Sequence, residues 1–99
     1  MSLLGFTFAR IEGESMQPML PPGCLALFRR PLFRALQVAR GDVVLVDHPD
    51  FGIIVKRAVA IGDDDQVALE GLSLVSTSPE KLGSVSKRLV LGVFVRRLT

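Results

Sequence analysis

Short apolar runs rich in β-branched residues alternate with turn sequences along the chain. Residues 43–46, Val-Val-Leu-Val, are typical of a strand, and residues 48–50, His-Pro-Asp, are typical of the turn that ends it. Residues 62–65, Gly-Asp-Asp-Asp, predict a hairpin turn between two further runs. We predict strands over residues 2–9, 25–29, 43–46, 53–61, 66–70 and 89–98, the last interrupted at Gly92.

Helix-forming sequence is scarce in this chain. Only Leu32–Val38 favours a helical turn or two, and Pro31 suits the first position of such a turn. The 99 residues are enough for one domain and contain no repeat or linker. We therefore predict a single all-β domain over residues 1–99, a coiled β-sandwich or partial barrel of short strands.

Charge and composition exclude several classes of function. Twelve Lys and Arg stand against ten Asp and Glu, and every aromatic residue is Phe. Such a weak positive charge with few stacking platforms does not predict a nucleic-acid partner. Cys24 is the single cysteine, so no internal disulfide can form, which fits a reducing cytoplasmic setting. His48 is the single histidine, so we expect no metal site.

The apolar N-terminal run, residues 2–9, is too short to span a bilayer and lacks a basic leader. It is better interpreted as a strand with Leu4, Phe6 and Phe8 on one face. Contact of this apolar edge with a membrane surface is an alternative interpretation. We expect a cytoplasmic protein without a transmembrane segment, with peripheral membrane contact as an alternative.

Ser15 stands in a turn sequence, residues 13–20, Gly-Glu-Ser-Met-Gln-Pro-Met-Leu. A Ser hydroxyl becomes a good nucleophile only when a base takes its proton. Gly13 lets the backbone approach a substrate closely, and Pro18 fixes the local geometry. The turn can therefore present the Ser15 hydroxyl outward, with the backbone N–H directed at a developing oxyanion. Taken by itself, this motif also fits an ordinary Ser in a turn.

Lys56 is the candidate base, since it lies inside an apolar strand. Strand alternation puts Ile54 and Lys56 on one face and Val55 and Arg57 on the other. A free Lys amine is almost wholly protonated at neutral pH. Burial disfavours the ammonium form, and a nearby Arg57 would act in the same direction. The alternatives are a Lys whose head group reaches solvent and the single histidine as the base.

Three segments resemble those of signal peptidase I and its relatives. Residues 13–23 resemble the nucleophile box of this family. Residues 41–44, Gly-Asp-Val-Val, resemble the opening of one of its strands, and residues 55–59, Val-Lys-Arg-Ala-Val, resemble its general-base box. They occur in the family's order, and weaker landmarks follow at residues 83–85 and 91–93. The resemblance implies a signal peptidase-like fold, a serine peptidase with Ser15 as nucleophile and Lys56 as general base, and no cofactor.

The compact layout without an anchor is most similar to the nickel-type superoxide dismutase maturation protease. That resemblance implies removal of an N-terminal extension from a precursor polypeptide, so that the nickel-binding hook becomes the new N-terminus. It also implies that Ser76 orients the Lys amine. The family motif that contains this Ser also carries an Asp and an Arg, and both are missing from residues 70–80. Gly13, in addition, has no hydroxyl to complete an oxyanion hole.

An extended substrate would lie against a strand edge, with Gly13, Met16 and Ile54 as substrate-binding residues. Met16 has an alternative role in the core. Two other functions stay open: processing of an exported protein at the membrane surface, and a non-catalytic β-barrel binding module that retains the motifs. A self-cleaving repressor would need further segments before Ser15, for which the short stretch there has no room.

Overall fold

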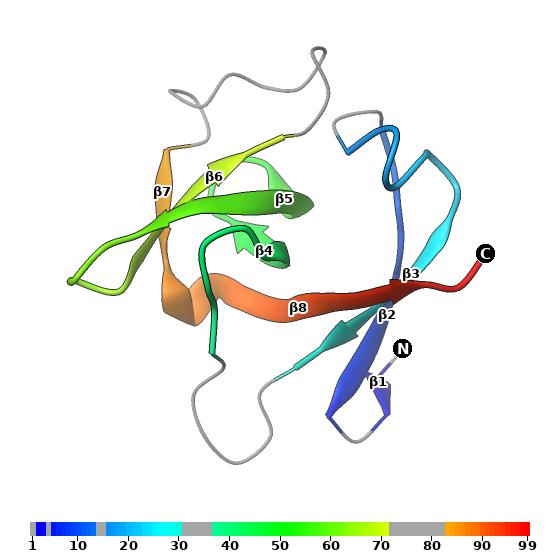
Figure 1. Ribbon diagram of the computed structural model, residues 1–99, viewed down its shortest axis with the longest axis horizontal. Coiled ribbons are helices and arrows are strands. Elements are labelled where there is room, and N and C mark those ends of the chain that lie inside the picture. The colour runs from blue at the N-terminus through cyan, green and yellow to red at the C-terminus, as the bar shows by residue number, and fades with distance from the viewer. Residues whose placement is uncertain (1, 4, 14–15, 31–36, 72–82) are drawn as a thin grey trace.

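The computed structural model describes residues 2–3, 5–13, 16–30, 37–71 and 83–99, which form an all-β structure (Figure 1). Its strands pair antiparallel in one curled sheet with the order β1-β2-β3-β8-β4-β5-β6-β7. This confirms the predicted fold class of a small β-sandwich or partial barrel. The described elements are β1 (Ser2–Leu3), β2 (Phe6–Arg10), β3 (Leu25–Arg29), β4 (Val43–His48), β5 (Gly52–Ile61), β6 (Gln66–Glu70), β7 (Ser84–Ser86), the 3₁₀ helix η1 (Lys87–Leu89) and β8 (Val90–Arg97).

The predicted single strand over residues 2–9 is wrong, because the chain turns back at Gly5. This glycine has φ +63°, in the left-handed region that side chains with a Cβ avoid. The turn folds β1 onto β2, with Ser2 opposite Thr7 and Leu3 opposite Phe6. Leu4, predicted to share a face with Phe6, lies outside the described residues.

The other strand predictions agree closely with the structure. The bounds of β3 and β6 are those expected, and the hairpin turn at residues 62–65 joins β5 to β6. β7 and η1 were not predicted, and Ser86 caps η1 by accepting a hydrogen bond from the Arg88 N–H. The helical turn predicted over Leu32–Val38 falls almost wholly outside the described residues.

β4 lies between two hydrophobic cores, so both of its faces are buried. Val44 and Val46 belong to one core, whereas Val43 and Leu45 belong to the other. A continuous apolar run, rather than an alternating one, is typical of a strand covered on both sides. The first core also contains Ala58, Val67, Leu69, Val85, Val90 and Val93, and the second contains Ile11, Met16, Leu20, Cys24, Ala26 and Phe28.

β8 joins the two halves of the sheet, since it pairs with β3 along one edge and with β4 along the other (Figure 1). The expected interruption at Gly92 is wrong, because the strand continues through this residue. A Cβ at Gly92 would lie 2.9 Å from the Phe28 Cβ and 3.1 Å from the Arg29 carbonyl oxygen. Glycine is thus needed here for close strand packing, not for a break.

Candidate functional site

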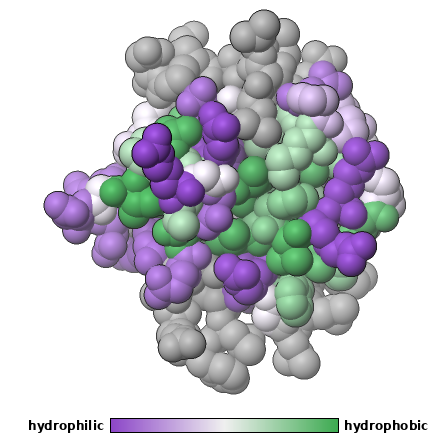
Figure 2. All heavy atoms as spheres, in the orientation of Figure 1, coloured by the Kyte–Doolittle hydropathy of each residue, from purple (hydrophilic) through white to green (hydrophobic). Residues whose placement is uncertain are grey.

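A groove of about 380 Å³ lies between the end of β2 and the first half of β5. One wall is the backbone and side chains of residues 9–13, and the other is formed from Phe51 and residues 53–56. Met16 and Leu45 complete the lining. Figure 2 shows hydrophobic surface gathered across the middle of the face viewed, with hydrophilic surface to either side of it.

Both walls of the groove include strand edges that no described strand pairs. β1 pairs only with Phe6 and Thr7 of β2, so the same edge of β2 is open at residues 8–10. β6 pairs with β5 only from Arg57 onward, so residues 52–56 of β5 are open on that side. Open strand edges carry backbone donors and acceptors that an extended peptide can pair with. The groove therefore has the backbone chemistry to hold a polypeptide segment.

Lys56 lies in the lining of this groove, on β5, directly opposite Val44 of β4. Its side chain is 5% exposed, and the neighbouring residues Val44 and Ala58 are fully buried. Burial lowers the pKa of the Lys56 amine, because desolvation disfavours the ammonium form. A buried lysine with a lowered pKa in a groove is a group suited to accept a proton.

Arg57 lies on the opposite face of β5 and takes no part in lowering the pKa of Lys56. Burial is the cause of that lowering, so the contribution expected from Arg57 is not found. The Arg57 Nη2 instead lies 3.8 Å from the Glu70 Oε2 on β6, where both side chains are about two-fifths exposed. The alternation of β5 therefore separates the two neighbouring cations onto different faces of the sheet.

The groove brings together the predicted substrate-binding residues and the predicted base. Gly13, Met16, Ile54 and Lys56 all belong to its lining. Gly13 has φ +75°, in the left-handed region that glycine adopts readily. Met16 is 1% exposed and also packs in the second core, so its two expected roles coexist. Ser15 and Ser76 lie outside the described residues.

Backbone hydrogen bonds hold the segment on either side of Gly13 and Met16. The Ile11 N–H donates to the Cys24 carbonyl, and the Gly23 N–H donates back to the Ile11 carbonyl, at 2.9 and 2.8 Å. The Leu20 N–H donates to the Met16 carbonyl at 2.9 Å. The nucleophile motif is therefore anchored at both ends on the second core.

Sequence reasoning missed two apolar residues of the groove, Phe51 and Ile53. Their side chains are 44% and 60% exposed, although both residues are large and hydrophobic. Ile53 was taken as an ordinary strand residue, since period-two alternation alone does not distinguish a groove wall from a core. The signal that could have identified them is their position before the candidate base: Ile53 lies three residues earlier on the same strand, and Phe51 lies five residues earlier, directly before that strand begins.

His48, the alternative base, is engaged in the turn between β4 and β5. Its Nδ1 accepts hydrogen bonds from the backbone N–H groups of Asp50, at 3.0 Å, and Phe51, at 3.3 Å. Its ring contacts that of Phe51, with centroids 4.9 Å apart. The side chain is 4% exposed and does not belong to the lining of the groove. These contacts assign His48 to the turn and argue against its use as the base.

The described part of the chain holds neither a metal-type cluster nor a helix that could span a membrane. No three His, Cys, Asp or Glu side chains among these residues gather as a metal site would require. No helix within the same residues has the length and apolar character needed to cross a membrane.

Comparison with known proteins places the chain in a family. No curated protein matches the sequence. Residues 5–84 match the family described as Peptidase S24-like, a span that includes Gly13, Met16, Ile54 and Lys56. The match supports the signal peptidase-like superfamily and a serine peptidase in general. Because it covers most of the sequence, the chain belongs to the Peptidase S24-like family.

Proposed function

We propose that this protein is a serine endopeptidase in which Lys56 activates Ser15. Lys56 in its neutral form takes the proton of the Ser15 hydroxyl as the oxygen attacks a peptide carbonyl. The same group then protonates the leaving amine, and water hydrolyses the acyl-enzyme. The backbone N–H of Ser15 and a second donor hold the oxyanion.

The observation that carries this proposal is the burial of the Lys56 amine in the groove. Burial lowers the pKa of the amine, which raises the fraction able to act as a base. Gly13 and Met16, which bracket the candidate nucleophile in the sequence, line the same groove. Ser76 is the proposed positioning residue for the amine, on the basis of the resemblance alone.

A polypeptide is the proposed substrate because the groove combines open strand edges with an apolar lining. An extended segment would hydrogen-bond to β2 or β5, and its side chains would contact Met16, Ile53 and Ile54. We propose that the reaction removes an N-terminal extension from a precursor, with the nickel superoxide dismutase propeptide as the first substrate to test. That last assignment is supported by the resemblance of the sequence motifs.

The test is mass spectrometry of a nickel superoxide dismutase precursor incubated with the protein and with Ser15→Ala and Lys56→Met variants. A single cut at the hook junction, absent with both variants, is expected. A cut that survives Ser15→Ala would overturn the nucleophile assignment. If this precursor stays intact while a mixed peptide library is cut in a Ser15-dependent way, the peptidase stands and the dismutase assignment fails. No Ser15-dependent cut in either would favour a binding module.

A further inference from the structure

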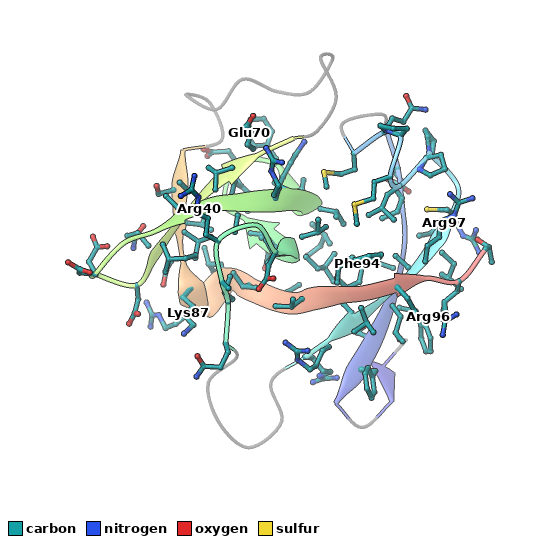
Figure 3. All side chains as sticks on the ribbon, viewed as in Figure 1. Arg40, Glu70, Lys87, Phe94, Arg96 and Arg97 are labelled. Atoms are coloured by element: carbon teal, nitrogen blue, oxygen red, sulfur yellow. The ribbon has the colours of Figure 1, made fainter. Side chains whose placement is uncertain are left out.

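A second cavity, which we call the arginine pocket, lies on the face of β5 opposite Lys56. It has a volume of about 320 Å³ and is lined by Arg40, Gly41, Arg57–Val59 and Glu70. Figure 3 shows Arg40 and Glu70 on the side of the molecule where β5 and β6 lie, away from Arg96 and Arg97 near the C-terminal end of β8. The peptidase chemistry proposed above uses none of the side chains of this pocket.

The guanidinium of Arg57 is incompletely satisfied. Its Nε is buried and has no hydrogen-bond partner. Its Nη2 lies 3.8 Å from the Glu70 Oε2, which is an ion-pair separation but too long for a hydrogen bond. The side chain as a whole is about 40% exposed, so the outer Nη groups are the part of the guanidinium that an acceptor in the cavity can reach.

Arg40 adds a second positive charge to the same pocket. The turn that carries it is fixed to β5, since the Gly41 N–H donates to the Ala58 carbonyl at 2.7 Å and the Ala58 N–H donates to the Asp42 carbonyl at 2.8 Å. The Asp42 carboxylate accepts from the Ala39 N–H at 2.8 Å and does not line the pocket. The pocket lining therefore contains two arginines, Arg40 and Arg57, and a single carboxylate residue, Glu70.

We propose that the arginine pocket binds a small oxyanion of the phosphate or carboxylate type through Arg57 and Arg40. The two Nη groups of one arginine form a fork that matches two oxygens of such an anion. An oxyanion there gives the outer nitrogens of Arg57 the hydrogen-bonded acceptor that Glu70, 3.8 Å away, does not supply, and Arg40 balances its remaining charge. Glu70 competes for Arg57 and so weakens the site.

The experiment is a titration of the ¹⁵N-labelled protein, followed through the backbone amide signals of Gly41 and Ala58. Inorganic phosphate and acetate are added separately, with chloride at equal ionic strength as the reference. Saturable shifts of both signals with either oxyanion, and none with chloride, are expected. Phosphate alone or acetate alone would identify the type of oxyanion preferred. Equal responses to all three salts, or no saturable response, would overturn the proposal.

Three variants and one control make the test specific. Arg57→Lys retains the charge but loses the fork, so binding should weaken about tenfold or more. Arg40→Gln should weaken it about threefold, and Glu70→Gln should strengthen it by a similar factor. Arg96→Gln, an exposed change at the other end of the molecule, should leave it unchanged. The same weakening in Arg96→Gln as in Arg40→Gln would show nonspecific attraction and overturn the site, and Arg40→Gln remains decisive if Arg57→Lys fails to fold.

Discussion

Lys56 and Val44 are cross-strand partners in the β4–β5 ladder, and the two side chains are 5% and 0% exposed. Directly opposite residues on antiparallel strands share a face, so the stem of Lys56 packs against a fully buried valine of the first core. Apolar packing of this kind removes water from the amine and lowers its pKa. The core that stabilises the fold therefore also adjusts the candidate base.

The first prediction concerns the stability of Lys56→Met, which keeps the length of the side chain but removes the amine. Because burial lowers the pKa of Lys56, the unfolded chain holds this proton more tightly than the folded chain. The free energy of unfolding of the wild type should therefore rise with pH between the folded and unfolded pKa values. Lys56→Met should be more stable than the wild type at pH 7. The difference between their free energies of unfolding should become smaller toward alkaline pH.

Urea unfolding of both proteins at pH 7 and at a mildly alkaline pH measures this difference. Lys87→Met, a change in the 3₁₀ turn, where no residue is buried, is the control and should show no comparable pH dependence. If the difference in the free energy of unfolding between wild type and Lys56→Met widens as the pH rises, burial is not the cause of the pKa shift.

The second prediction concerns the pH dependence of peptide cleavage. A neutral amine is the active form, so activity should rise with pH along a limb whose midpoint lies below the pKa of a free lysine. Lys56→Arg should be inactive at every accessible pH, since a guanidinium does not lose its proton. The measurement is kcat/KM against pH, with Lys87→Arg as the control. An active Lys56→Arg protein would remove Lys56 from the role of base.

The third prediction separates the turn from the chemistry at His48. His48→Ala removes the acceptor for the N–H groups of Asp50 and Phe51, so it should cost about 1–3 kcal/mol of stability. Cleavage per folded molecule should remain, because His48 does not line the groove. Thermal unfolding and kcat measured below the unfolding transition check both parts. Loss of kcat in a folded variant would return His48 as a candidate base.

The fourth prediction tests the close packing of β8 against β3. Gly92→Ala would bring a Cβ within 2.9 Å of the Phe28 Cβ and 3.1 Å of a backbone oxygen, so the strands must shift apart. We expect a loss of about 1–3 kcal/mol in the free energy of unfolding, as for other overpacked sites. Leu91→Ala, at an exposed neighbour on the same strand, should change it by only about 0.5 kcal/mol. Equal stability of Gly92→Ala and wild type would contradict the packing.

The pattern of the sequence determined the strands wherever local signals agree. Apolar β-branched runs bounded by Gly, Pro and Asp gave β3 and β6 with their observed bounds and located β4, β5 and β8 to within a few residues. The predictions at Gly5 and Gly92 were wrong. A glycine permits a left-handed turn at one position and close strand packing at another, and the local sequence does not distinguish the two. Which of these occurs depends on neighbours that are distant in the sequence.

Four residues that the sequence predicts for the site, Gly13, Met16, Ile54 and Lys56, line one groove. Tertiary structure decided their environment. Only the curling of the sheet brings the end of β2 opposite β5, with both edges unpaired by any described strand and with Phe51 and Ile53 exposed beside them. Likewise, the sequence puts Lys56 and Arg57 on opposite faces, but the packing of other strands decides which face is buried. Burial and cavities arise from contacts between distant segments, and for this reason only the folded chain reveals the desolvated amine and the arginine pocket.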